Sequence, residues 1–233
     1  MVRDETVKAI EAALEHDPAI NLHRCPLRIE HDDAVRLVGT VEDIRAKRRA
    51  LMLARQAGGT DAVYDDMRLD TATQRGEREL CRAVVDMLKQ EPAFAEIHIA
   101  EGDPPPDEGA LDVIAVAAEG ARVHLRGHVA SLSRRRLAEV LAWWVPGVGD
   151  VVNALHVEPA EQDSDGELAD AVRLALEKDP SIPGRQLDIT ARNGMIRLEG
   201  AVDSEEQRRL AILDCWYIPG VHGVEDALSV KTP

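Results

Sequence analysis

Three stretches of the chain place apolar residues at the three- and four-residue spacing of an amphipathic helix. Each stretch ends at an acidic residue followed by proline: Asp17-Pro18, Glu91-Pro92 and Asp179-Pro180. Proline disfavours the α conformation of the residue before it, so each pair predicts the end of a helix. The apolar positions that mark these helices are Val7, Ile10 and Leu14, then Cys81, Val84 and Leu88, then Leu168, Val172 and Leu176.

After each predicted helix the pattern changes to the alternation that is typical of a β-hairpin. The second strand of each hairpin follows the pattern V-x-L-x-G-x-V or a close variant, with its glycine at Gly39, Gly127 or Gly200. We expect these structural repeat glycines to face the core, where the backbone of a helix or strand comes close. In the third copy Asn193-Gly194 predicts the hairpin turn, since both residues accept a positive φ.

A second helix and a final strand complete each copy. Small residues occupy the helix face that is expected to contact the sheet: Ala50 and Ala54, Ala138 and Ala142, Ala211 and Cys215. A Gly-Gly or Pro-Gly pair ends the helix, and the last strand is expected to run parallel to the strand before the helix. The sequence therefore predicts an α+β fold of three tandem αββαβ units, each a three-stranded mixed sheet with two helices on one face.

The predicted units span residues 1–70, 76–158 and 166–231, with short polar linkers between them. The first is a degenerate copy, because Gly58-Gly59-Thr60 stands where the others have proline-glycine-valine. The second has a proline-rich insertion near residues 101–109. Its first strand, residues 111–118, is apolar on both faces, so another unit or a second protomer is expected to cover it. We therefore expect the middle unit to be an assembly hub.

The unit resembles the BON domain, named for bacterial osmotically inducible and nodulation proteins. The residues that carry the resemblance are Gly200-Ala201-Val202, Pro219-Gly220-Val221, Val224 and the strand at 227–230. The resemblance implies a non-catalytic module, with no catalytic residues or cofactor to carry over, and a connection with stress responses. It also implies relatives that are mostly envelope proteins, proposed to bind phospholipid surfaces, to chaperone clients or, with another module, to bind potassium.

Charge and composition narrow the partners and the compartment. With 43 acidic and 28 basic residues the formal net charge is −15, which repels nucleic-acid backbones and anionic lipid headgroups at long range. The opening residues form an acidic amphipathic pattern and not a signal peptide, and no apolar run is long enough to span a membrane. We therefore expect a cytoplasmic location, and a periplasmic one only if an upstream signal was removed. The cysteines, Cys25, Cys81 and Cys215, indicate neither a disulfide framework nor a zinc site.

Two sets of side chains are candidates for an interaction surface. The first set consists of basic pairs at one place of the second helix: Lys47 and Arg48, Arg135 and Arg136, Arg208 and Arg209. They present either an anion contact three times or a charged solvent face, and we favour the solvent face. The second set consists of the aromatic pairs Trp143-Trp144 and Trp216-Tyr217. Adjacent helical residues point about 100° apart, so one of each pair is expected to pack on another unit or another chain.

No reactive constellation is apparent. His124, His128 and His156 are on outward faces of neighbouring predicted strands, and we interpret them as part of a solvated sheet face and not as metal ligands. Our leading hypothesis is a non-enzymatic scaffold that binds a protein partner or self-associates, without cofactor, metal or nucleic acid. The alternatives are a phospholipid or membrane-surface binder, and an ion or small-ligand sensing module.

Overall fold

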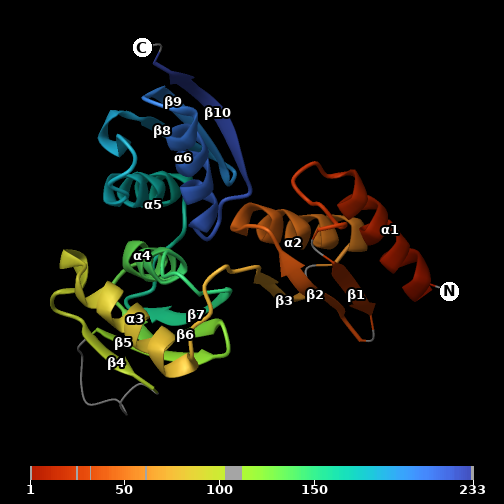
Figure 1. Ribbon diagram of the computed structural model, residues 1–233, viewed down its shortest axis with the longest axis horizontal. Coiled ribbons are helices and arrows are strands. Elements are labelled where there is room, and N and C mark those ends of the chain that lie inside the picture. Colours follow the sequence, from red (N-terminus) through yellow and green to blue (C-terminus); the bar gives the residue numbers. More distant parts are fainter. Residues whose placement is uncertain (1, 25, 32, 61, 103–111, 232–233) are drawn as a thin grey trace. The chain divides into compact units, whose positions relative to one another are not determined.

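A computed structural model describes residues 2–24, 26–31, 33–60, 62–102 and 112–231. The chain divides into two compact units, Met1–Asp70 and Thr71–Pro233. Both are built from small mixed sheets with helices packed on them, so the predicted α+β class is confirmed (Figure 1). Each unit is described by itself below.

The first unit has two helices and a three-stranded sheet. Its elements are α1 (Val2–His16), β1 (Leu27–His31), β2 (Val35–Val41), α2 (Ile44–Gly58) and β3 (Val63–Leu69). β1 pairs antiparallel with β2, and β3 pairs parallel with β2. Ile29 lies opposite Leu37, the register that keeps Leu37 facing the core. Ala50 and Ala54 are fully buried, and these small side chains allow α2 to lie close to the sheet.

The second unit begins with a sheet of four strands and not the three that the sequence predicts. Its elements are α3 (Glu77–Lys89), η1 (Pro92–Phe94), β4 (His98–Glu101), β5 (Val113–Glu119), β6 (Arg122–Val129), α4 (Leu132–Trp143) and β7 (Asp150–Val157). The additional strand is β4, which pairs parallel with the outer edge of β5. β5 has four consecutive buried residues, from Val113 to Val116, and this explains its apolar character on both faces. Residues 103–111, with most of the proline-rich insertion, lie outside the described residues.

The second unit ends with a second helix pair and a three-stranded sheet. Its elements are α5 (Asp165–Lys178), η2 (Gly184–Gln186), β8 (Asp188–Arg192), β9 (Met195–Val202), α6 (Glu205–Tyr217) and β10 (Gly223–Val230). Asn193 and Gly194 both have positive φ, 51° and 76°, as the predicted hairpin turn requires. The hydroxyl of Ser204 accepts a hydrogen bond from the backbone N–H of Gln207 (3.2 Å) and caps α6. β10 runs parallel to β9.

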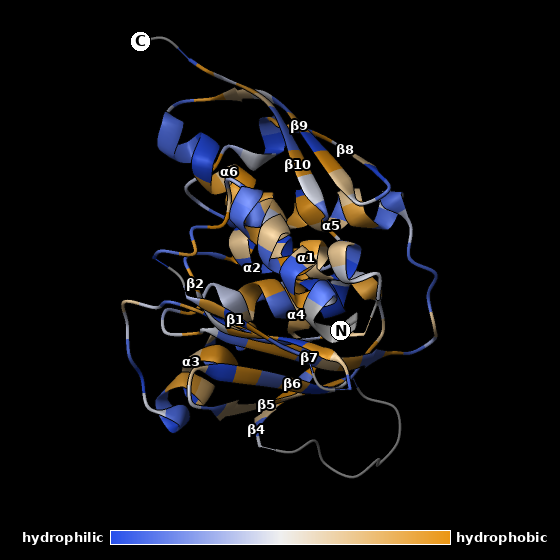
Figure 2. Cartoon of the chain, turned by 90° about the vertical axis from the view of Figure 1, so that its right-hand side faces the viewer, coloured by the Kyte–Doolittle hydropathy of each residue, from blue (hydrophilic) through white to orange (hydrophobic). Residues whose placement is uncertain are grey.

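The two halves of the second unit pack through their helices. α4 contacts α3 of its own half and also α5 and α6 of the following half. Strands such as β6 alternate hydrophobic and hydrophilic residues along their length (Figure 2). One face of each sheet is therefore covered by its own helices, and the helices of the two halves cover each other. This arrangement places the ends of four helices at one junction.

The repeat glycines allow a close approach between hairpin strands. Their φ values are +145° at Gly39, +120° at Gly127 and +133° at Gly200, which a residue with a side chain rarely adopts. A Cβ atom at Gly127 would lie 2.2 Å from the carbonyl oxygen of Val113, whereas one at Gly200 would lie 3.0 Å from that of Gln186. Gly127 is therefore the less tolerant of the two.

We expect Gly127→Ala to destabilise the second unit by about 3 kcal/mol and Gly200→Ala by a smaller amount, because only the first combines a positive φ with a severe backbone overlap. Gly166→Ala, on the exposed first turn of α5, is the matched control and should be neutral or slightly stabilising. Chemical denaturation followed by tryptophan fluorescence measures this, since Trp143, Trp144 and Trp216 all belong to the second unit. Equal losses at Gly127 and Gly166 would contradict this reasoning.

Candidate functional site

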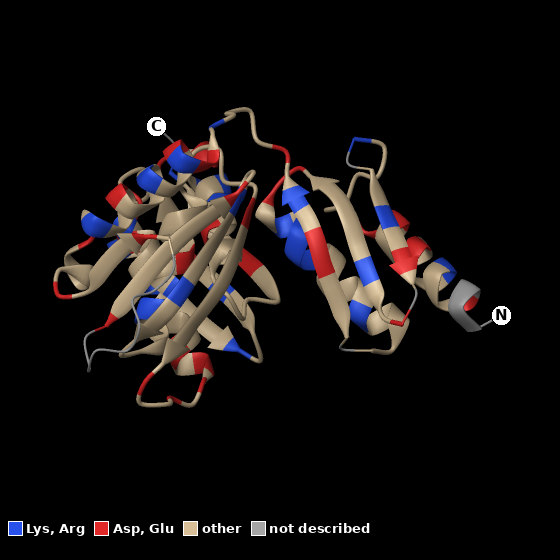
Figure 3. Ribbon diagram, turned by 90° about the horizontal axis from the view of Figure 1, so that it is seen from below, with Lys and Arg blue, Asp and Glu red and all other residues tan. Residues whose placement is uncertain are grey.

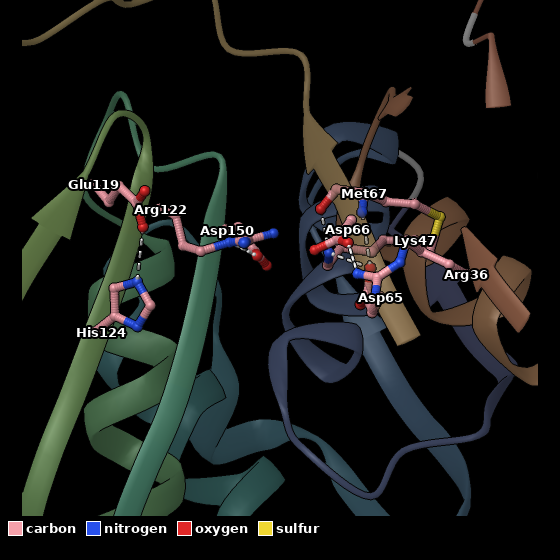
Figure 4. A network of polar contacts seen from close by, with 9 residues as sticks. All are labelled: Arg36, Lys47, Asp65, Asp66, Met67, Glu119, Arg122, His124 and Asp150. Carbon is pink, nitrogen blue, oxygen red and sulfur yellow. Dashed lines mark hydrogen bonds and ion pairs between the residues drawn. The ribbon is translucent and has the colours of Figure 1, made fainter. Parts of the chain in front are cut away.

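The first basic position of the repeated pair forms an ion pair inside its own unit. The ammonium group of Lys47 donates to Asp65 on β3 (2.8 Å) and to the carbonyl oxygen of Met67 (2.5 Å), as Figure 4 shows. In the second half of the second unit, Arg208 of α6 donates to Asp226 on β10 (2.7 Å). These side chains therefore attach the second helix to the final strand.

The first half of the second unit has an amide side chain in place of this carboxylate on its final strand, β7. Asn153 of β7 donates from its amide nitrogen to the carbonyl oxygen of Arg135 (2.9 Å) and to Glu139 (3.1 Å). Its side-chain oxygen accepts a hydrogen bond from the backbone N–H of Leu155, two residues later (3.2 Å). The carboxylates of Asp65 and Asp226 accept the same bond from the backbone N–H groups of Met67 and Leu228. The recurrence of an aspartate or asparagine two residues after each aligned valine was a signal in the sequence for this contact.

The second basic position has a different environment in each copy. Arg209 is exposed and pairs with Glu206 one turn earlier on α6 (2.6 Å). Arg48 is half-buried on α2. Arg136 is only 5% exposed. In the ribbon of Figure 3, acidic and basic residues are interspersed along the described helices and strands.

Arg136 joins the two halves of the second unit. It lies on α4 and donates two hydrogen bonds to Asp163 in the segment before α5 (2.7 and 2.6 Å). It also donates to the carbonyl oxygen of Pro219, which follows α6 (3.2 Å). Both bonds to Asp163 come from Nη2, whereas Nη1 is buried without a hydrogen-bond partner among the described residues. Arg136 therefore has a structural role and is not presented to solvent.

The aromatic pairs meet at the same junction. Trp143 and Trp216 are buried, and Trp144 and Tyr217 are half-buried. The rings of Trp143, from the first half, and Tyr217, from the second, have centroids 6.1 Å apart and planes inclined at 38°. The contact joins the second and third predicted repeats, as expected if one member of an aromatic pair packs outside its own repeat.

A cleft of about 560 Å³ lies beside this aromatic contact. It is formed where the C-terminal ends of α3, α4 and α5 meet the second half of α6. Apolar and aromatic side chains make up much of its wall. The lining residues are Met87, Gln90, Glu91, Leu141, Trp143, Trp144, Lys178, Asp179, Pro180, Ser181, Leu210, Leu213, Asp214 and Tyr217.

Four charged or ionisable carboxyl and ammonium groups lie in the cleft. Lys178 of α5 donates to the carboxylate of Glu91, which follows α3 (2.5 Å). Asp179 accepts the backbone N–H of Ser181 (2.7 Å). Asp214 of α6 is only 4% exposed. Burial and the neighbouring Asp179 carboxylate raise the pKa of Asp214 to about 8, although an interaction with Trp144 opposes this shift.

Two polar atoms of the cleft residues are buried without a hydrogen-bond partner among the described residues. They are the Oδ2 atom of Asp214 and the indole nitrogen of Trp143. Buried polar atoms are nearly always hydrogen-bonded in folded proteins, so two such atoms in residues that line one cleft distinguish it from the rest of the surface. The cleft is therefore the candidate functional site.

The sequence predicted part of this site. It singled out Trp143, Trp144 and Tyr217, which line the cleft, and Trp216, which does not. It missed Asp214, Asp179 and Lys178. A signal for Asp214 was available, because it falls where the aligned copies have Leu141 and Leu53.

The remaining candidates form no metal site. His128 and His156 are neighbours in the register of β6 and β7, and His124 lies opposite Val152. Within the part of the chain that the structure describes, no three histidine, cysteine or acidic side chains are grouped as metal ligands. Cys81 and Cys215 are buried free thiols, as small core residues are expected to be, and Cys25 lies outside the described residues.

The fold and the cleft define a class: small α+β domains joined in tandem, with a cleft at their junction. The profile of the BON domain family matches residues 106–159 and 164–232. The chain belongs to the BON domain family. The profile places two BON domains in the second unit, and residues 1–70 lie outside the matched segments.

Comparison with known proteins gives one curated relative and several structures. The chain is 29% identical to osmotically-inducible protein Y of Escherichia coli (strain K12) over 124 residues, which are 51% of this chain and 62% of that protein. Similar structures include the C-terminal domain of CdsD, the structural protein of the type III secretion system of Chlamydia trachomatis. That alignment has a TM-score of 0.26 and 13% identity over 97% of both chains. Another is the PrgH periplasmic domain, with a TM-score of 0.25 and 10% identity over 90% of this chain and 96% of that one. Such low scores carry no argument about the fold.

The cytoplasmic location expected from the sequence is wrong. The finding that overturns it is the match to the BON domain family and to osmotically-inducible protein Y of Escherichia coli, a relative of the envelope type that the resemblance implied. An acidic amphipathic opening and a highly charged surface suit either side of a membrane, so these features could not decide the compartment. No helix among the described residues is both long enough and apolar enough to cross a bilayer.

We expect the contribution of Asp214 to the stability of the second unit to become less favourable as pH rises from about 4 to about 8. The folded pKa of Asp214 lies above its ordinary value of 3.8, so across this range the folded state retains a proton that the unfolded state has lost. Asp214→Asn removes this dependence and should make the unit more stable than the wild type at pH 8, by roughly a few kcal/mol. Denaturation at several pH values, with the exposed Asp188→Asn as control, measures the difference. If Asp214→Asn and Asp188→Asn followed the same pH profile, Asp214 would not be the buried acid described above.

Proposed function

We propose that this chain is a non-enzymatic scaffold of tandem BON domains that holds its partner at the cleft between the two domains of the second unit. The observation that carries the proposal is the cleft itself, in which buried polar atoms of Asp214 and Trp143 have no hydrogen-bond partner among the described residues. Buried polar atoms without a partner are uncommon in folded proteins, and both of these belong to residues that line the cleft.

Hydrogen bonds and ion pairs join the two domains of the second unit near the cleft. Arg136 connects α4 with the segment before α5 and with Pro219 after α6, and Lys178 of α5 connects with Glu91, which follows α3. Such links between domains restrict their relative movement and hold the cleft in a preformed shape. A preformed site loses less conformational entropy when a partner binds.

We include residues 1–70 in the scaffold as a divergent third BON domain. The unit has the same order of helices and strands as residues 165–230. Gly39 has the same positive φ and close backbone contact as Gly127, and the pair Lys47–Asp65 corresponds to Arg208–Asp226. These contacts arise from residues at aligned positions, which supports a common origin of the unit.

The phospholipid alternative has less support. Of the six residues in the basic pairs, Lys47, Arg208 and Arg136 are paired with Asp65, Asp226 and Asp163. Arg209 is paired with Glu206, so few of the six remain to attract an anionic headgroup. Trp143 and Trp216 are buried in the second unit and cannot enter a bilayer interface without unfolding it. The binding surface that we propose is therefore a cleft and not a membrane-facing patch.

Site-specific photo-crosslinking in the native cell tests the cleft. With a photoreactive residue at Ser181, which is exposed and lines the cleft, we expect crosslinked species that are absent when the same residue replaces Glu199 on the exposed outer face of β9. Adding Leu213→Arg, which introduces a long charged side chain into the cleft, should reduce the crosslinked species at Ser181 several-fold.

Unchanged circular dichroism and melting temperature of Leu213→Arg would show that the loss is not caused by unfolding. Equal crosslinking from Ser181 and Glu199, or an undiminished yield in Leu213→Arg, would overturn the proposal. In either case the binding surface would lie elsewhere on the chain.

A further inference from the structure

The residues that line the cleft favour a positively charged ligand. Trp143, Trp144 and Tyr217 line it, and all three come from the C-terminal ends of α4 and α6. The face of an aromatic ring carries partial negative charge, and tryptophan gives the strongest attraction to a cation among the aromatic side chains. Leucine side chains complete the wall, which suits the alkyl part of an organic cation better than a hydrated metal ion.

The charge of the cleft is also negative. Lys178 and Glu91 neutralise each other through their ion pair. Asp179 has no ion pair among the residues that the structure describes, and Asp214 lies beside it with Oδ2 unpartnered. A single positive charge beside these two carboxyl groups would stabilise their ionised forms and give Asp214 an electrostatic partner.

The buried donor adds a second requirement. The indole N–H of Trp143 has no acceptor within the described part of the chain. A ligand that satisfies both orphaned atoms therefore carries a positive group for Asp214 and an oxygen acceptor for Trp143. A hydroxyl or ether oxygen fits this role, because a carboxylate would be repelled by Asp179.

We propose that the cleft binds a small organic ammonium ion that bears a neutral oxygen acceptor. The volume of about 560 Å³ lies within the range of small-molecule sites, roughly 300–1,000 Å³. A metal ion is a poorer match, since no group of three candidate ligands occurs among the described residues. The inference rests on the proposed function to the extent that both use this cleft.

Binding of such a cation is coupled to release of a proton. The ionisable groups that line the cleft are Glu91 from the end of α3, Lys178 and Asp179 from the end of α5, and Asp214 and Tyr217 from α6; α4 contributes no ionisable side chain to it. Because the cation stabilises the charged form of Asp214, it lowers the pKa of that carboxyl group. At pH 7 we therefore expect up to one proton to be released for each cation bound.

Isothermal titration calorimetry of the full chain with choline as the probe tests the proposal. We expect choline to bind at least ten-fold more tightly than its neutral isostere 3,3-dimethylbutan-1-ol, and several-fold more tightly than propyltrimethylammonium, which lacks the hydroxyl. Titration in two buffers of different ionisation enthalpy should show proton release, and Asp214→Asn should abolish that release and weaken binding at least ten-fold. Because Asp214→Asn is expected to remain folded at pH 8, its melting temperature controls for stability.

The exposed Asp188→Asn variant should bind choline as the wild type does. Equal binding of choline and the neutral alcohol, or unchanged binding in Asp214→Asn, would overturn the proposal. Tighter binding of potassium or calcium chloride than of choline would do the same. If no organic cation binds while the Ser181 crosslinks persist, the ligand class is wrong and the scaffold proposal stands; if those crosslinks also fail, both are wrong.

Discussion

The second unit depends on burying the charge of Arg136 between two domains that are each too small to have an extensive core. A guanidinium group taken out of water is costly unless it is paired, and Arg136 is paired through Nη2 with the carboxylate of Asp163 and through Nε with the carbonyl oxygen of Pro219, while Nη1 has no partner among the described residues. One acceptor precedes α5 and the other follows α6 within the second domain, whereas Arg136 itself lies on α4 of the first. The arginine can therefore be buried only when the two domains are docked in one arrangement.

This docking explains why the cleft exists where it does. The aromatic residues that end α4 and α6 meet across the junction, and Lys178 reaches Glu91 from the opposite domain. With four helix ends converging, the side chains between them do not fill the space completely, and Asp214 is left buried with an unpartnered oxygen. The same constraint that makes the unit rigid therefore produces a site with a defined charge and shape.

Local patterns predicted the elements well, because each depended on neighbours in sequence. The Asn193-Gly194 turn, the parallel last strands and the buried alanines of α2 all follow from period, turn chemistry and handedness. β4 was missed because its pairing with β5 crosses the insertion, and a short strand at a sheet edge has little pattern of its own. The role of Arg136 was missed for a related reason. Its partners, Asp163 and Pro219, are distant in sequence, and no local pattern distinguishes it from the exposed Arg209.

Native-state hydrogen exchange of the full chain, resolved by mass spectrometry, tests most directly whether the two BON domains form one body. The account predicts that peptides from β6 and from β9 exchange with the same opening free energy. It also predicts that Asp163→Ala, which leaves the guanidinium of Arg136 buried without its carboxylate, lowers both values together by about 2–3 kcal/mol. Different opening free energies for the two strands, or a loss confined to one of them, would contradict the claim that Arg136 joins the domains.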